Sequence, residues 1–98
     1  MITEIADLKI RTEQRAEFLA AIHRAAQTVL SKAQGYLSHQ ILPCVESPDR
    51  VVLIVQWKTL EDHTVGFRQS AAFADWRAII GPYFAQAPHV EHFETSLP

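Results

Sequence analysis

The sequence lacks most of the features that specialised binding classes require. A single cysteine, Cys44, excludes an internal disulfide and any zinc site built on cysteine pairs, and it is typical of a reducing compartment. With only 3 glycines there is no glycine-rich phosphate loop, so a nucleotide or classical flavin site is not expected. Lys and Arg are scattered rather than clustered, which argues against nucleic-acid binding.

Long apolar runs and a basic leader are also missing. The longest uncharged apolar-rich stretch, residues 51–57, is far too short to span a membrane. The chain has 98 residues, of which 48% are hydrophobic and 20% charged, and this composition is ordinary for a globular protein. We therefore expect a single domain over residues 1–98, located in the cytoplasm, with no membrane or nucleic-acid partner.

The first half of the chain predicts a strand and a long helix. Residues 2–10 carry apolar side chains among polar ones and are typical of a strand, although its inward face is ambiguous by one residue. Apolar residues recur with helical period over residues 13–33. Thr12 is the expected N-cap, and Gly35 is placed to end the helix in a left-handed conformation.

Residues 36–45 and 51–58 predict two strands joined by the turn at residues 47–49. The expected register places His39 opposite Trp57. Pro43 has no amide donor, so the first of these strands should lie at the edge of the sheet.

The second half predicts two short helices and a last strand. Thr59 begins a capping pattern for a helix that runs to about residue 69. Ser70 is a second N-cap, for a helix that Gly81 and Pro82 end. Residues 90–95 form the last expected strand.

This order predicts an α+β protein of the ferredoxin-like split βαβ type, with a four-stranded antiparallel sheet and helices on one face. One face of the hairpin is suited to burial under the helices. The opposite face still carries Leu42, Val52 and Ile54, and this is too apolar to meet water alone. A second copy of the chain is the natural cover, so we expect a homodimer.

Two stretches carry a resemblance to a known family. The segment from Gln56 to His63 and the segment from Phe67 to Trp76 resemble the antibiotic biosynthesis monooxygenases, in which a Trp ends the third strand and a Ser opens the next helix. The resemblance implies a dimeric α+β barrel with a pocket between sheet and helices in each subunit. In some members of the family the pocket oxidises electron-rich phenolic compounds with dioxygen and without a cofactor.

The resemblance also indicates which chemistry of the family is not retained. Haem-degrading members use an Asn, a Trp and a His at positions that match Asp7, Phe67 and Arg77 here, so haem handling is the last-ranked alternative. Many quinol-type members have two His at positions that match Phe67 and Phe73.

The candidate site residues follow from this pattern. His63 is the candidate catalytic base, four residues before Phe67 and on the same helical face, and Arg68 is the candidate anion stabiliser. The residues expected around the pocket are Asp7, His39, Trp57, Phe67, Trp76 and His92. No metal site is expected, because His89 and His92 face opposite sides of a strand.

The sequence thus predicts a cofactor-independent monooxygenase that acts on a small aromatic or quinol-like compound. The alternative is a non-catalytic member of the same superfamily that binds a small hydrophobic ligand or serves in a stress response. The ordinary structural roles of histidines and aromatic side chains in a small core also stay open at this point.

Overall fold

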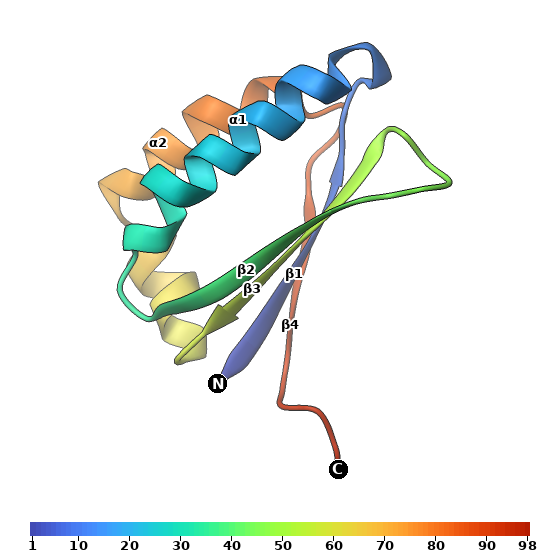
Figure 1. Cartoon of the computed structure of the whole chain (residues 1–98). Helices are drawn as coiled ribbons and strands as arrows, with labels where there is room; N and C mark the ends of the chain where they lie inside the picture. The colour runs from blue at the N-terminus through green and yellow to red at the C-terminus, as the bar shows by residue number, and fades with distance from the viewer.

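The computed structural model, which describes residues 1–98, consists of a four-stranded antiparallel sheet with both helices on one face (Figure 1). The sheet order is β2-β3-β1-β4. The elements are β1 Ile2–Lys9, α1 Arg15–Thr28, β2 Tyr36–Pro43, β3 Arg50–Trp57, the π-helix η3 Asp62–Phe67, α2 Ala71–Ile80 and β4 His89–Phe93. This confirms the predicted ferredoxin-like α+β class, with β2 at the edge of the sheet as Pro43 required.

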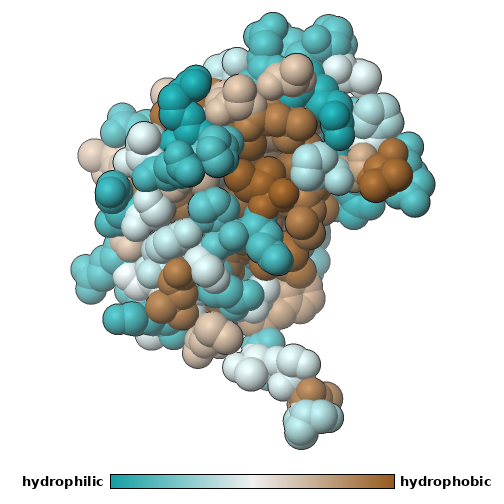
Figure 2. Space-filling view, viewed as in Figure 1, coloured by the Kyte–Doolittle hydropathy of each residue, from teal (hydrophilic) through white to brown (hydrophobic).

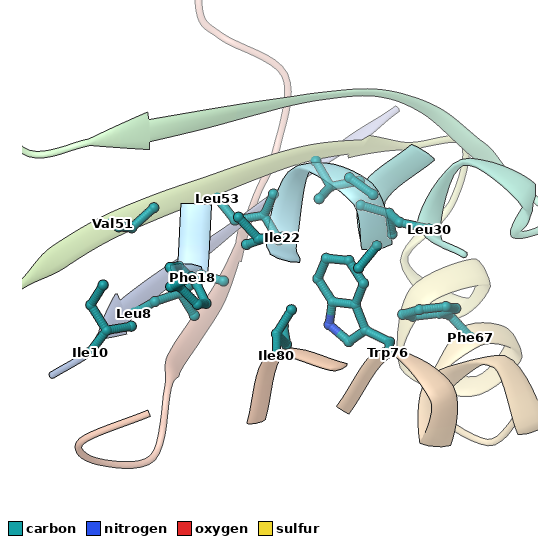
Figure 3. Packing of buried hydrophobic residues seen from close by; sticks show 14 of the residues in the cluster. Leu8, Ile10, Phe18, Ile22, Leu30, Val51, Leu53, Phe67, Trp76 and Ile80 are labelled. Carbon is teal, nitrogen blue, oxygen red and sulfur yellow. The ribbon is translucent and has the colours of Figure 1, made fainter. Parts of the chain in front are cut away.

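The core lies between the helices and one face of the sheet. In β1 the even-numbered side chains face the helices, because Ala6 and Leu8 are buried while their neighbours are more exposed. Phe18 and Ile22 of α1 and Trp76 and Ile80 of α2 point toward this face (Figure 3). Full burial of such a side chain stabilises a fold by about 1.5–3 kcal/mol, so each of these residues contributes substantially to the stability of the fold.

The first helix is shorter than predicted. Thr12 does not cap it, because residues 12–14 form a separate 3-10 turn, and α1 ends at Thr28, after which residues 30–32 form another 3-10 turn. β-branched residues such as Thr and Val lose rotamer freedom in a helix, which fits an end at Thr28. Gly35 is left-handed, with φ 83°, but it leads into β2 instead of ending α1. Neither helix is long and apolar enough to cross a membrane.

The predicted hairpin register is wrong by two residues. His39 lies opposite Val55, and Tyr36 takes the place opposite Trp57. The connection is longer than expected, because the amide of Cys44 still bonds to the carbonyl of Arg50 at 2.9 Å. A shift by two preserves the faces of a strand, so the predicted inward set on β3 is still buried.

The segment between β3 and α2 is wound more widely than a standard helix. Thr59 Oγ1 accepts from the amide of Asp62 at 3.1 Å, which confirms its predicted capping role, but residues 62–67 form a π-helix. Ser70 Oγ accepts from the amide of Phe73 at 3.3 Å and confirms the second N-cap. Turns of π-helix frequently occur at functional sites.

The face of the sheet away from the helices carries an apolar cluster, which we call the outer-face cluster. Its members come from all four strands and are only half-buried or exposed: Ile5, Leu42, Val52, Ile54 and Phe93. Figure 2, viewed as in Figure 1, shows apolar side chains gathering over the strands while the helical side is mostly hydrophilic.

Candidate functional site

A cavity of about 230 Å³ opens between α2 and the helix-facing side of the sheet. Its wall is mainly apolar, with a small polar group at one side. The lining residues include Leu8, Leu30, Leu53, Phe67, Phe73, Trp76, Ile80 and Val90, with Glu4, His63, Arg68 and Arg77 as the charged or titratable ones. An apolar pocket with a few convergent polar groups is the usual form of a small-molecule site.

Glu4 is the carboxylate of this cavity. It lies on β1 in phase with Ala6 and Leu8, so it faces the helices and is only 6% exposed. Its Oε1 accepts a hydrogen bond of 2.9 Å from Nε1 of Trp57 on the neighbouring strand. Burial raises the pKa of Glu4, and the Trp57 bond and the charge of Arg68 oppose that rise to a lesser extent.

His63, on the π-helix, is buried beside Glu4. Its ring stacks on Trp57, with centroids 5.1 Å apart, and its Nε2 lies 3.4 Å from Oε1 of Glu4. Burial lowers the pKa of His63 to about 4, and the positive charges of Arg68 and His92 act in the same direction. The imidazole is therefore neutral at neutral pH and can accept or relay a proton.

His92 completes the polar group from β4. It lies directly opposite Glu4 in the β1–β4 pairing, and its Nε2 is 2.7 Å from Nδ1 of His63. One of the two rings must donate a proton in this contact. Burial and the charge of Arg68 lower the pKa of His92.

Arg68 and Arg77 bring positive charge to the cavity from the start and the middle of the α2 region. Neither guanidinium forms a salt bridge with a carboxylate of the chain. Both are exposed, so they are available to an anion that enters the cavity.

Most of the residues that the sequence singles out meet in this place. His63, Arg68, Phe67 and Trp76 line the cavity. Trp57 and His92 contact its polar group through Glu4 and His63.

Asp7 does not lie at the cavity, contrary to the expectation for the pocket. It is in β1, but out of phase with Glu4, and so it faces the other side of the sheet. There it forms a bidentate pair with Arg50, with N–O distances of 3.0 and 2.8 Å. This bonding lowers the pKa of Asp7 and makes it a surface ion-pair residue.

His39 is also absent from the cavity wall. The shifted register and the bulge at the start of β2 place it beside Tyr36, whose hydroxyl lies 2.6 Å from its Nδ1. Burial lowers the pKa of His39. Its contact with Tyr36 is that of a satisfied histidine at the edge of the sheet.

Glu4 is the residue that sequence reasoning missed. A signal was present, because Glu4 shares its strand face with Ala6, Leu8 and Ile10, which are all apolar. A carboxylate in phase with an apolar face is unusual and marks a buried charge that needs partners. No group of three or more His, Cys, Asp or Glu side chains is arranged to hold a metal ion.

Comparison with known proteins gives consistent results over almost the whole chain. A family model described as antibiotic biosynthesis monooxygenase matches residues 1–79. The uncharacterized protein YczJ of Bacillus subtilis (strain 168) is 38% identical over 94 residues, which are 96% of this chain and 98% of YczJ.

Solved structures extend the similarity. A protein of Bordetella bronchiseptica named "Putative antibiotic biosynthesis monooxygenase" is 35% identical, with a TM-score of 0.91, over 98% of this chain and 97% of its own. SnoaB of Streptomyces nogalater, a cofactor-independent oxygenase, has a TM-score of 0.81 at 15% identity, over 99% of this chain and 94% of its own. At that identity the likeness to SnoaB concerns the fold alone.

Proposed function

The chain belongs to the antibiotic biosynthesis monooxygenase family, and from this premise we propose that it is a cofactor-independent monooxygenase that oxidises a small aromatic or quinol-like compound with dioxygen. Its site would be the cavity between α2 and the sheet. His63 would take part in the removal of the substrate proton, and Arg68 would stabilise the resulting anion.

The observation that supports this proposal is the polar group formed by the buried Glu4 and His63 and the partly exposed His92 at the wall of an apolar cavity. A neutral phenol or quinol scarcely reduces dioxygen, whereas its anion does so by one electron. The protein therefore has to deprotonate the substrate, stabilise the anion and exclude bulk water. The aromatic wall formed by Phe67, Phe73 and Trp76 suits a flat substrate.

The balance of the reaction defines what must be measured. A monooxygenase puts one atom of dioxygen into the substrate and releases the other as water, so a hydroquinone gives a hydroxyquinone and an anthrone gives an anthraquinone. Simple autoxidation of a quinol gives the quinone and hydrogen peroxide. The proposed activity therefore consumes dioxygen without forming peroxide and labels the product with oxygen-18 from the gas.

The test is oxygen uptake with a panel of quinols and anthrones, with peroxide measured in parallel. His63→Ala and Arg68→Gln should each lower turnover by about 100-fold or more, as expected for loss of an acid–base group or an anion stabiliser. His23→Gln is the matched control, because His23 is exposed on α1 and distant from the cavity wall.

Two results would contradict the assignment. Absence of turnover by the wild-type protein across the panel would exclude this substrate class, and unchanged turnover in His63→Ala would remove His63 from the reaction. Binding of the same compounds without oxygen uptake would instead favour the alternative of a ligand-binding protein.

We also propose that the protein is a homodimer. The outer-face cluster supports this, since Leu42 and Phe93 are 44% and 46% exposed and lie on the same face of the sheet as Ile54. Contiguous apolar surface of this kind is typical of an interface, and pairing of one face with its own copy is the commonest arrangement.

A further inference from the structure

Both ring nitrogens of His63 are turned toward other side chains. Nδ1 lies 2.7 Å from Nε2 of His92, and Nε2 faces Oε1 of Glu4 at 3.4 Å. His63 lines the cavity, but its Nδ1 is taken by His92 and the atom nearest to its Nε2 is a carboxylate oxygen of Glu4. Glu4 is therefore the second group through which a bound molecule can be deprotonated.

Glu4 offers a free acceptor atom. Its Oε1 accepts from Trp57 and lies 3.4 Å from Nε2 of His63, whereas its Oε2 accepts no hydrogen bond from the chain, and the residue lines the cavity. The walls around it offer hardly any other acceptor, since most of the lining side chains are apolar and the remaining charged ones are arginines. A carboxylate oxygen in such surroundings calls for a donor from a ligand.

We propose that Glu4 is the catalytic base of this cavity, that it binds the hydroxyl of a phenol or quinol through Oε2, and that His63 and His92 carry the proton away. This deepens the proposed function and rests on it for the identity of the reaction. The apolar and aromatic walls hold the ring of the substrate, and the charge of Arg68 stabilises the phenolate.

The proton balance is complete within these groups. The O–H bond of the substrate breaks, its electron pair stays on oxygen, and the proton passes to Glu4, which becomes a neutral carboxylic acid. Glu4 keeps this proton while the phenolate is bound. After the oxidised product has left, the acid gives its proton to Nε2 of His63, while Nδ1 of His63 gives a proton to Nε2 of His92. The net result is one proton moved from the cavity to His92, which is partly exposed and delivers it to water.

The residues of the proton path come from three separate elements of the fold. Glu4 and His92 are direct partners on adjacent strands, and the wide turn of η3 inserts His63 against both of them and against the Trp57 ring. His63 and His92 are positioning and relay residues in this scheme. Only Glu4 touches the substrate.

The first experiment is infrared difference spectroscopy on anaerobic binding of para-nitrophenol, at a pH where Glu4 begins ionised. The wild-type protein and the control Glu91→Gln, which alters an exposed carboxylate facing the other side of β4, should both gain a carboxylic-acid band together with bound phenolate. Glu4→Gln should lack the band. Failure of the phenol to bind, binding as the neutral phenol, or phenolate without the band would overturn the proposal.

The wild-type spectrum decides the matter even if a Glu4 variant does not fold. Because no dioxygen is present, the outcome is separate from that of the proposed function. A carboxylic-acid band without oxygen uptake would support Glu4 as the phenol-binding base and contradict the proposed oxygenase activity. Oxygen uptake without the band would support the oxygenase activity and contradict the role of Glu4.

Turnover provides a second readout that a purely structural role would not move. Glu4→Gln should lower kcat on a quinol by about 100-fold or more, and the loss should shrink as more acidic, already ionised quinols are used. His92→Gln should lower kcat by about tenfold, with recovery on addition of imidazole. A loss that is independent of substrate acidity, or one that imidazole does not restore, would contradict the relay.

Discussion

Nδ1 of His63 and Nε2 of His92 lie 2.7 Å apart, so a π-helix and the last strand share one proton at the wall of the cavity. Two histidines this close cannot both be protonated at low cost, since each positive charge disfavours the other. Burial adds to this effect and lowers the pKa of both rings. The consequence extends beyond the site, because a histidine that is held neutral makes stability depend on pH.

Stability should fall as the pH is lowered from about 6.5 toward 4. The pKa of His63 is about 4 in the folded chain and near its ordinary value of 6.5 in the unfolded chain, so the unfolded state takes up the proton first. Glu4 acts oppositely, because its raised pKa contributes stability that is lost as the pH rises above 4.5. The two contributions are separated by comparing variants at the same pH values.

The measurement is urea unfolding at pH 6.5 and pH 5. The wild-type protein should lose about 1–2 kcal/mol more between these values than His63→Gln does. His23→Gln, on the exposed face of α1, should keep the wild-type difference. Identical losses in the wild type and His63→Gln would mean that His63 is not held neutral by the fold.

Trp57→Phe should move the acid limb of kcat/KM to higher pH. The indole of Trp57 donates to Glu4 at 2.9 Å and so lowers the pKa of that carboxylate, and phenylalanine cannot donate. The free energy of unfolding should fall by about 2–4 kcal/mol, because a fully buried indole is replaced by a smaller ring and a hydrogen bond to a carboxylate is lost.

Trp76→Phe is the matched control for this prediction. Trp76 lies on the same cavity but makes no hydrogen bond to Glu4, so its replacement should cost packing energy and leave the acid limb in place. A pH profile of kcat/KM checks both variants. Equal shifts in the two, or no shift in Trp57→Phe, would separate Trp57 from the titration of Glu4.

The sequence predicted the fold well because its signals were local. Periodicity located the helices and strands, Ser70 and Thr59 marked helix starts, and Pro43 placed β2 at an edge. The register of the hairpin was not predicted, because the loop length depends on how Cys44 and Arg50 continue the pairing. The end of α1 at Thr28 likewise follows from backbone geometry that periodicity does not encode.

The sequence predicted those parts of the site that depend on local spacing. His63 and Phe67 are four residues apart and share a face, which spacing alone indicates, and both are buried at the cavity. The sequence left open which face of β1 points toward the helices. For that reason Asp7 was expected at the pocket, whereas Glu4 is the residue that lies there. The contact of His63 with His92 joins distant segments and could be found only in the folded chain.

Gly35→Ala should destabilise the protein and disturb the turn that carries His63. Gly35 has φ 83°, which costs other residues about 1–2 kcal/mol, and a Cβ there would clash with the carboxylate of Asp62 at the start of η3. We expect a loss of about 1–3 kcal/mol in the free energy of unfolding.

The double variant Gly35→Ala with Asp62→Ala separates the two causes. It removes the carboxylate that the new methyl would meet, so only the backbone cost of about 1–2 kcal/mol should remain, relative to Asp62→Ala alone. Urea unfolding of the four chains checks this double-mutant cycle. A loss that the second substitution does not reduce would show that the Asp62 contact is easily relieved.

Ile54→Lys should convert the proposed dimer into a monomer. Ile54 lies at the centre of the outer-face cluster, opposite Ile5 on β1 and Gln40 on β2, and a lysine there would bring a charge against the partner's apolar surface. The wild type should have twice the chain mass of 11.1 kDa in light scattering, and Ile54→Lys should have the single mass. Gln27→Lys adds the same charge at an exposed position of α1 and should stay dimeric.

The melting temperature of the wild type should rise with protein concentration, because association stabilises the folded state, and that of Ile54→Lys should not. A monomeric wild type, or an Ile54→Lys variant that keeps the wild-type mass, would show that this face is not the interface.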